Sequence, residues 1–153
     1  MGCDIHSYAE RREGGRWVEL PKMEPFGEQS YSVFGWLAGV RNYSAVAPIS
    51  EPRGLPADMS AATARHYDDW RGAAHAESWL TVAELLAVDY EQEIEDRRTT
   101  KQRGPTFWSG SETCAPGEGH KQTLREFLGR SFFDDLKKLQ EAGAERVVFW
   151  FDN

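Results

Sequence analysis

Cysteine is nearly absent from this sequence: Cys3 and Cys114 are the only two among 153 residues. Two cysteines are too few for a disulfide framework, so we expect a protein of the reducing cytoplasm. Long apolar runs are missing as well, and no stretch approaches the 18 residues of a membrane span. The acidic, histidine-bearing start also lacks the apolar segment of a signal peptide. We therefore expect no membrane partner.

Positive charge is in short supply. The sequence has 18 Lys and Arg residues against 25 Asp and Glu, which gives a net charge of −7 and a pI near 5.1. This balance argues against a broad nucleic-acid surface, which usually needs a basic face. It is compatible with a small phosphorylated molecule held by a few arginines or a metal. The sequence contains no P-loop and no Gly-x-Gly-x-x-Gly, and it does not support a Ser or Cys triad.

Aromatic residues are plentiful, with six tryptophans in a short chain. We expect some of them to lie in the core and others to line a ligand surface. At this length we expect residues 1–153 to form one domain that buries ~70 % of its unfolded surface. The oligomeric state stays open, a homo-oligomer included.

The segment that begins the sequence carries the strongest chemical signal. Asp4 and His6 are two residues apart, so in a strand they lie on one face, roughly 6 to 7 Å apart. Tyr8 and Glu10 continue that face, while Cys3 and its alternate neighbours are small or apolar. Paired oxygen and nitrogen ligands suit Zn, Mn, Fe or Ni better than Ca. The alternative is a capped turn followed by a hydrogen-bonded histidine.

The first half of the chain predicts a hairpin and two helices. Residues 3–11 and 16–20 read as strands around Gly14-Gly15. Residues 30–40 have helical spacing with Ser30 as the N-cap, and 41–60 read as a structured loop followed by a helical turn at 60–67. Thr81 and Glu84 form a capping box for a helix that ends near Val88.

The second half predicts a long loop, a helix and a strand. Residues 91–120 are charged and then rich in Gly, Ser, Thr and Pro, so they form either a lid over a site or a disordered excursion. Residues 123–142 carry a helical apolar stripe that ends at Gly143. Residues 145–151 read as an interior strand.

These elements predict an α+β fold, with a single sheet of about four strands and two or three helices packed on one face. The two most apolar ends, 3–9 and 145–151, are expected to be neighbours in that sheet. If they pair, Asp152 approaches the edge that carries Asp4 and His6.

A second group of polar residues precedes the capped helix. Asp69 and His75 lie on a predicted loop held by a rigid element, where site residues tend to be found. Asp4, His6 and His75, with Asp69 or Asp152, would form a mixed site for a divalent metal such as Zn or Mn. Water bound to such a metal becomes a nucleophile near neutral pH. Asp69 or Asp152 would complete the shell or act as the catalytic base; the alternative for His75 is an ordinary loop histidine.

Arginines near the proline-rich loop suggest an anion site. Arg53 lies in a proline-bounded turn and could present its guanidinium to a phosphate or carboxylate. Arg41 could do the same, although a cation also suits the end of the preceding helix. Tyr43 and Trp70 would supply stacking surfaces for a nucleotide.

Several segments together resemble a family of small proteins of bacteriophages and their bacterial hosts that open with Met-(Gly)-Cys-Asp-Ile-His. The matching segments are Met1–His6 with Glu10, Tyr31–Asn42, Pro52–Pro56, His75 with Ser78–Thr81, and Val148–Asn153. One departure is Arg71–Glu77, where such proteins carry a stretch richer in Asp, Gly and His. The resemblance implies a phage or prophage context, and hence the host cytoplasm, but it implies no reaction.

Three hypotheses follow from these features. The first is a metal-dependent phosphoesterase acting on a nucleotide-like small molecule, with Arg53 holding the anion. The second is a non-catalytic phage accessory protein with an anti-defence role, which sequesters a nucleotide signal. The third is a protein that blocks a host enzyme through an acidic, tryptophan-bearing surface.

Overall fold

The computed structural model describes residues 2–103 and 107–153, with side chains over 2–100 and 110–153. The chain forms two compact units, and each is described by itself. The sheet unit comprises Met1–Gln29, Pro52–Val88 and Arg130–Asn153, and the hairpin unit comprises Ser30–Glu51 and Asp89–Gly129. The expectation of a single domain stays a prediction.

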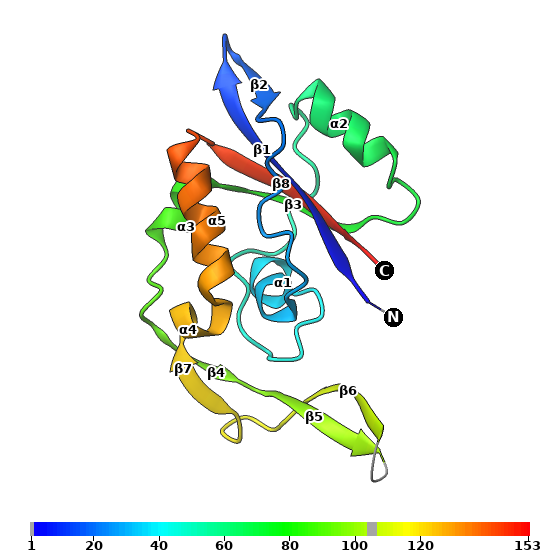
Figure 1. Cartoon of the computed structure of the whole chain (residues 1–153), viewed down its shortest axis with the longest axis vertical. Coiled ribbons are helices and arrows are strands. Elements are labelled where there is room, and N and C mark those ends of the chain that lie inside the picture. The colour runs from blue at the N-terminus through cyan, green and yellow to red at the C-terminus, as the bar shows by residue number, and fades with distance from the viewer. Residues whose placement is uncertain (1, 104–106) are drawn as a thin grey trace. The chain divides into compact units, whose positions relative to one another are not determined.

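A four-stranded antiparallel sheet forms the centre of the sheet unit (Figure 1). Its strands, in spatial order, are β2 (Arg16–Glu19), β1 (Asp4–Glu13), β8 (Arg146–Asp152) and β3 (His75–Thr81). The segments that begin and end the chain therefore pair side by side, as the sequence predicted. The predicted α+β class with a single sheet of about four strands is confirmed for this unit.

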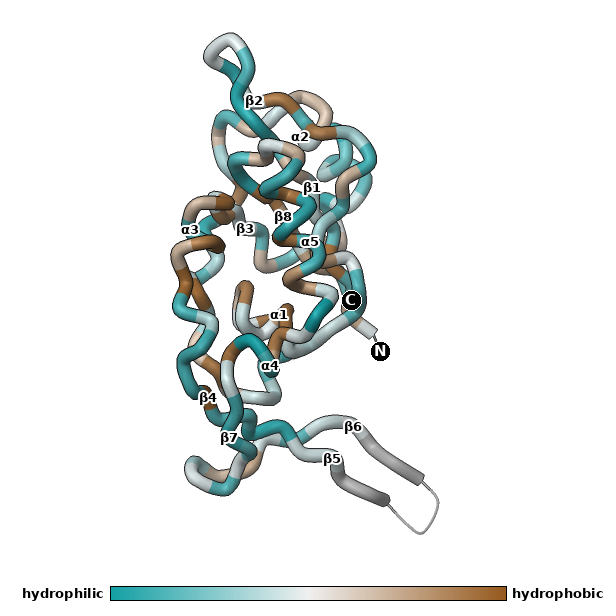
Figure 2. The backbone as a smooth tube through the Cα atoms, turned by 60° about the vertical axis from the view of Figure 1, so that its left-hand side comes forward, coloured by the Kyte–Doolittle hydropathy of each residue, from teal (hydrophilic) through white to brown (hydrophobic). Residues whose placement is uncertain are grey.

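Local sequence explains the hairpin and the strand at the centre of the sheet. Gly14 and Gly15 have φ angles of +58° and +80°, a conformation that glycine adopts without a steric penalty, so β1 turns tightly into β2. Strand β8 is buried along almost its whole length and stands out as hydrophobic in Figure 2. An apolar run of this kind is typical of a strand covered on both faces.

Helices pack on this sheet, and they lie on both of its faces. On the face of Tyr8 and Trp150, helix α2 (Ala61–Asp68) packs with Tyr67 edge-on to the Trp150 ring. On the other face the Ser7 hydroxyl donates to the carbonyl of Pro25. The next residue, Phe26, stacks on Phe132 of α5 (Arg130–Glu141).

The capping signals read from the sequence are confirmed. Ser30 caps α1 (Tyr31–Ala38), and its hydroxyl accepts a hydrogen bond from the Val33 amide. Thr81 and Glu84 form the capping box of α3 (Val82–Ala87), as predicted. These two caps need only local hydrogen bonds, which is why sequence spacing predicts them.

The predicted helix over 123–142 is wrong as a single helix. It is divided into α4 (Leu124–Leu128) and α5 at Gly129, whose φ is +84° and ψ 169°. That conformation cannot continue a helix. The apolar spacing continues across Gly129 from Leu128 to Phe132, so the pattern alone does not reveal the end of one helix and the start of the next.

The hairpin unit corrects the predicted loop at 91–120. Strand β4 (Glu93–Asp96) pairs with β7 (His120–Thr123), and β5 (Arg98–Arg103) pairs with β6 (Phe107–Thr113). The tip between β5 and β6, which the lid prediction includes, lies outside the described residues. Helices α1 and α4 supply the core of this unit, where Trp36 lies 5.9 Å from Tyr90. Burial raises the pKa of the Tyr90 phenol.

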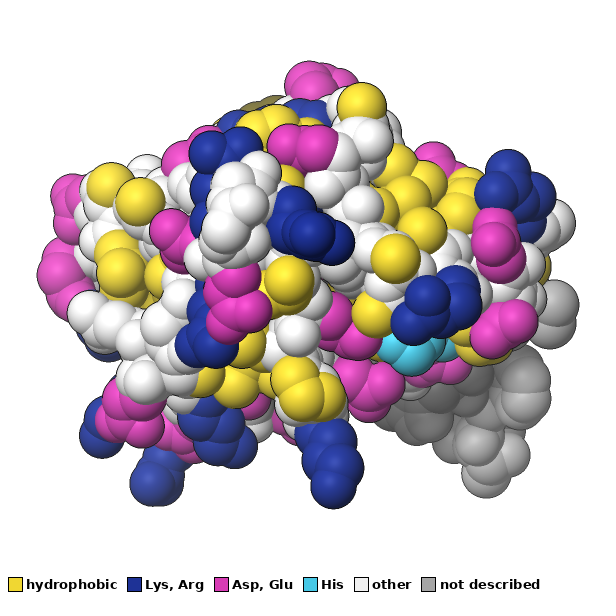
Figure 3. Space-filling view, turned by 90° about the horizontal axis from the view of Figure 1, so that it is seen from above, with side chains coloured by type: hydrophobic (Ala, Val, Ile, Leu, Met, Phe, Trp, Pro, Cys, Tyr) yellow, Lys and Arg dark blue, Asp and Glu magenta, His cyan; other side chains and the backbone are white. Residues whose placement is uncertain are grey.

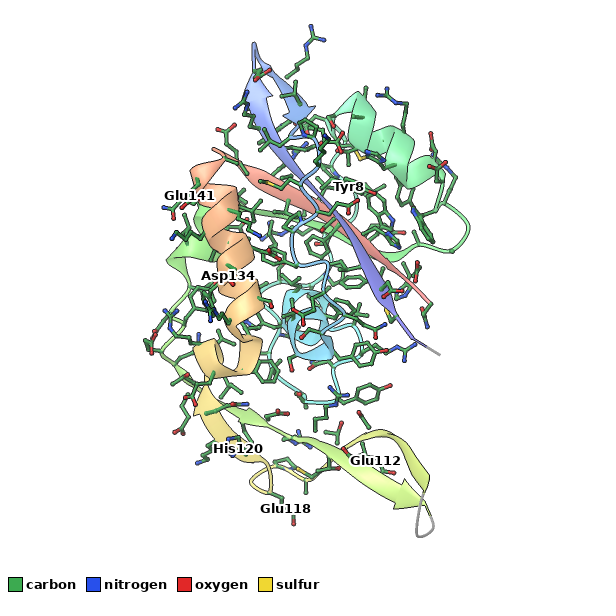
Figure 4. All side chains as sticks on the ribbon, in the orientation of Figure 1. Tyr8, Glu112, Glu118, His120, Asp134 and Glu141 are labelled. Carbon is green, nitrogen blue, oxygen red and sulfur yellow. The ribbon has the colours of Figure 1, made fainter. Side chains whose placement is uncertain are left out.

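The exposed polar side chains of this unit include Glu112, Glu118 and His120, which Figure 4 labels. No helix in the described ranges is long and apolar enough to cross a membrane.

Candidate functional site

One end of the sheet unit brings together residues from both ends of the chain. Asp4 pairs directly opposite Asp152, and His6 pairs opposite Trp150. Direct partners share a face of the sheet. The His6 Nε2 atom lies 2.7 Å from Asp152 Oδ2, a hydrogen-bond distance, and the side chains are 19 % and 18 % exposed. The expected approach of Asp152 to Asp4 and His6 is therefore observed.

Indole rings surround the His6 imidazole. The ring of Trp70 stacks on it with centroids 3.9 Å apart and planes inclined by 29°. The ring of Trp150 lies beside it at 6.3 Å. The Trp150 Nε1 atom is buried and has no hydrogen-bond partner among the described residues. The His6 imidazole is therefore packed against aromatic rings and hydrogen-bonded to a carboxylate.

The two other carboxylates predicted for this site lie at its margin. Asp4 is exposed, and its Oδ1 accepts a hydrogen bond of 3.2 Å from Gln29 Nε2. Asp69 is the exposed C-cap residue of α2 and directly precedes Trp70. Among the described residues, Asp69 makes no observed hydrogen bond to His6 or Asp152, so its role as catalytic base stays a prediction.

His75 lies on a strand and not on the predicted loop. It pairs opposite Phe151 of β8, with the two rings 6.2 Å apart. Phe151 also pairs with Ile5, so this register places His75 on the face opposite to His6. The His75 Nε2 atom is buried and without a partner among the described residues, and Ala76 beside it has a φ of +53°.

The predicted ligand set of Asp4, His6 and His75 is thus not brought together. Within the described residues, no group of three or more His, Cys, Asp or Glu side chains could hold a metal ion. His6 and Asp4 share a face with Asp152, while His75 belongs to the other face. Any ion at this end would have to use Asp4, Asp152 and His6, after the His6–Asp152 hydrogen bond had opened.

A second histidine–carboxylate pair lies on the same face of the sheet unit. His66 of α2 is 2.9 Å from the Glu19 carboxylate, and its ring stacks on Tyr8 at 4.3 Å. Figure 4 shows Tyr8 between β1 and α2. Burial is the largest cause that raises the pKa of the Tyr8 phenol, followed by the negative charges of Glu24, Glu19 and Asp69.

Arg53 does not present a free guanidinium. Its Nη1 and Nη2 atoms donate to the two carboxylate oxygens of Glu84 at 2.8 and 2.5 Å, and its guanidinium lies over the Trp79 ring at 4.7 Å. This pairing, with the Thr81 cap, lowers the pKa of Glu84 to about 2. The predicted anion clamp is therefore already occupied by a side chain of the protein.

Arg41 and Tyr43 belong to the hairpin unit. The Arg41 guanidinium lies 5.5 Å over the Tyr31 ring, and Tyr43 lies 6.2 Å from the same ring. Arg98 of β5 completes this group, because its guanidinium is within 6 Å of both tyrosines (5.6 and 5.9 Å). No spacing in the sequence places Arg98 with them, since this contact depends on how β5 folds back.

The residues missed from the sequence lie at the other end of β8. Arg146 Nε donates to Glu10 Oε1 at 2.7 Å, and both side chains are almost completely buried, at 4 % and 0 % exposed. Arg146 Nη1 donates to Asp58 at 2.9 Å. A weak signal existed, since Glu10 continues the face of His6 and Arg146 directly precedes an apolar run.

No known protein family, no curated protein and no solved structure matches this chain. The resemblance to small phage proteins therefore stays a prediction. The function has to be argued from the geometry of the two units alone.

Proposed function

We propose that this protein is a hydrolase in which the His6 imidazole transfers protons and Asp152 orients it. The observation that carries the proposal is the 2.7 Å contact between His6 Nε2 and Asp152 Oδ2. A carboxylate bound to one ring nitrogen fixes the orientation of the imidazole and stabilises its protonated form, while the other nitrogen, Nδ1, can face a substrate. Both side chains are partly exposed, which access to a substrate requires.

The substrate class that we propose is a small phosphate ester with a planar ring, such as a nucleotide. Trp70 supplies a half-exposed indole beside His6. Arg71 follows it, with a side chain that is 72 % exposed; its guanidinium lies 5.6 Å over the Tyr67 ring and donates to the exposed carboxylate of Asp68, 2.6 Å away. Exposed pairs are weak, so a phosphate could replace Asp68 as the partner of Arg71. Arg71 thereby takes the role that the sequence suggested for Arg53.

The test is hydrolysis of p-nitrophenyl phosphate and bis(p-nitrophenyl) phosphate, followed by nucleotides. We expect His6→Gln and Asp152→Asn to lower the rate by about 10²- to 10⁴-fold, the usual contribution of a positioned acid–base group. His66→Gln is the matched control, because it removes the other histidine–carboxylate pair on the same face. Retention of the wild-type rate by His6→Gln would contradict the proposal. Tight binding of a nucleotide without turnover would favour the sequestering role.

A second candidate function, metal-dependent hydrolysis, is favoured by the position of Asp4. Asp4 is the direct cross-strand partner of Asp152, and like charges in direct cross-strand pairs are destabilising. A divalent cation bound by Asp4, Asp152 and His6 would remove this repulsion and could activate water.

Asp4→Asn distinguishes the two candidates by the sign of its effect on stability. Without a cation, the substitution removes the repulsion and raises the free energy of unfolding by a few tenths of a kcal/mol, roughly. With a cation, it lowers both the melting temperature and the metal content measured by plasma mass spectrometry. A melting temperature that rises, with no metal in the wild type, would exclude the metal-dependent candidate.

A further inference from the structure

A groove at the opposite end of the sheet unit joins indole rings to cationic side chains. It has a volume of about 610 Å³, within the range of small-molecule sites, and Trp17, Trp79, Arg12 and Arg146 are among its lining residues. It lies six residues along β8 from Asp152, roughly 20 Å at the rise of a strand. It is therefore separate from the His6–Asp152 pair, and the inference below does not depend on the proposed hydrolysis.

The strand order explains how these side chains meet. Trp17 comes from the edge strand β2 and Trp79 from the other edge strand β3, while Arg146 lies on the central strand β8 between them. The loop that contains Leu55 and Asp58 forms part of the lining. Figure 3 views the molecule from above, from the end where β1 turns into β2, and shows Lys and Arg side chains next to hydrophobic ones on this surface.

Arg146, which lines this groove, has one unsatisfied hydrogen-bond donor. Its Nε and Nη1 atoms donate to Glu10 and Asp58, but Nη2 is buried and has no partner among the described residues. A buried donor without an acceptor is costly, so an acceptor supplied by a ligand would be stabilising there. The side chain is 4 % exposed and is held in place by its two carboxylate partners.

The aromatic rings limit the direction from which an acceptor can approach. The guanidinium carbon of Arg146 lies 3.8 Å from the centroid of the Trp17 ring, so the indole covers one face of the guanidinium. The Trp17 Nε1 atom donates to Asp58 at 3.0 Å, which fixes the ring. An acceptor must then approach Nη2 close to the guanidinium plane.

Charge favours an anionic ligand over a neutral one. Arg12 lines the groove, with its guanidinium 5.2 Å over the Trp17 ring, and adds a second cation beside Arg146. The Asp58 carboxylate already accepts hydrogen bonds from both Trp17 and Arg146. Glu10 is buried and bonded to Arg146 and to the Ser60 amide, so it does not face a ligand.

We propose that this groove binds a small molecule composed of a planar aromatic ring and an oxyanion. The ring stacks on Trp79, and the oxyanion accepts hydrogen bonds from Arg146 Nη2 and faces Arg12. A phosphate and a carboxylate satisfy the same donors, so the shared chemistry is the oxyanion joined to a ring. Stacking on an indole is tolerant of the ring type.

The experiment measures indole N–H shifts by ¹H–¹⁵N NMR during titration with adenosine 5′-monophosphate and with benzoate. Adenosine and inorganic phosphate serve as probes that each lack one half of the ligand. We expect selective shifts of the Trp17 and Trp79 indoles, with both half-ligands binding about tenfold or more weakly. Preference for the nucleotide would assign a phosphate ligand, and preference for benzoate a carboxylate; either result supports the proposal.

Two adjacent arginines give a matched pair of variants. Arg12→Gln removes a cation of the groove and should weaken binding of the preferred probe about tenfold, whereas Arg11→Gln should leave it unchanged. Arg11 is exposed and paired with Glu13, so both variants are expected to fold, which thermal melting will check. Trp79→Leu should weaken binding by a similar factor. Absence of indole shifts with either complete probe at millimolar concentration, or equal binding by both arginine variants, would overturn the proposal.

Discussion

Two hydrogen-bonded side-chain pairs link β1 to β8, and they differ in how far they are removed from water. The pair of Glu10 and Arg146 is 0 % and 4 % exposed, while the pair of His6 and Asp152 is 19 % and 18 % exposed. Both have a heavy-atom distance of 2.7 Å. The two pairs therefore differ in burial and not in distance. The buried pair stabilises the sheet, whereas the partly exposed pair is accessible to a ligand.

The buried pair is part of a larger network. Glu10 accepts hydrogen bonds from Arg146 and from the Ser60 amide, and Arg146 also donates to Asp58. This network joins β1, β8 and the loop before α2. A charge in such a place is tolerated only with its partner present. The partly exposed pair of His6 and Asp152 has no such requirement, because water can replace the missing partner.

The largest expected effect is therefore that of Glu10→Ala. It leaves the Arg146 guanidinium buried without its main partner, and we expect it to lower the free energy of unfolding by about 3 to 5 kcal/mol. Urea denaturation measures this value. Glu10→Leu combined with Arg146→Met is the control, since replacing both charges with apolar groups should recover much of the loss. A loss below about 1 kcal/mol for Glu10→Ala would contradict the claim that the buried pair stabilises the sheet.

A third pair, Arg53 and Glu84, contributes a stabilisation that depends on pH. The Arg53 guanidinium and the Thr81 cap lower the pKa of Glu84 to about 2. Because the folded pKa lies below the unfolded value of about 4.3, the stabilisation is complete above that value and is lost as the pH falls towards 2.

Glu84→Gln tests this sign while it keeps the capping box, which accepts Gln in place of Glu. The wild type should be the more stable protein at pH 7, as measured by thermal melting. The difference between the two proteins should shrink between pH 5 and pH 2. A difference that stays constant across this range would show that the Glu84 charge makes no contribution.

The sequence predicted the elements that depend on local signals. Ser30 and Thr81 cap helices through hydrogen bonds to amides three residues away, and Gly14-Gly15 turns the hairpin. The sequence also predicted that residues 3–9 and 145–151 pair, because their alternation and apolar character are typical of neighbouring strands in a sheet. These features need no knowledge of distant contacts.

The features that were missed depend on long-range pairing. His75 looked like a loop residue because β3 is short and partly polar, and only its partner Phe151 defines it as a strand. Strands β4 to β7 are hidden for a similar reason, since residues 91–120 are charged and then rich in Gly, Ser, Thr and Pro. Gly129 was overlooked because the apolar stripe continues across it.

The candidate site was predicted in part. Asp4, His6 and Asp152 do meet at one end of the sheet, and Trp70 stacks on His6. Arg53 is held by Glu84, which no spacing in the sequence could reveal. The face on which His75 lies was equally hidden, because it depends on the register of β3 against β8.

The most direct test of the central claim is a pair of double-mutant cycles measured by urea unfolding. One cycle combines Glu10→Leu with Arg146→Met, and the other combines His6→Gln with Asp152→Asn. We expect a coupling energy of about 2 to 3 kcal/mol for Glu10 and Arg146. For His6 and Asp152, which are partly exposed, we expect below about 1 kcal/mol. Equal coupling energies, or a larger one for His6 and Asp152, would contradict the account and make that pair a structural one.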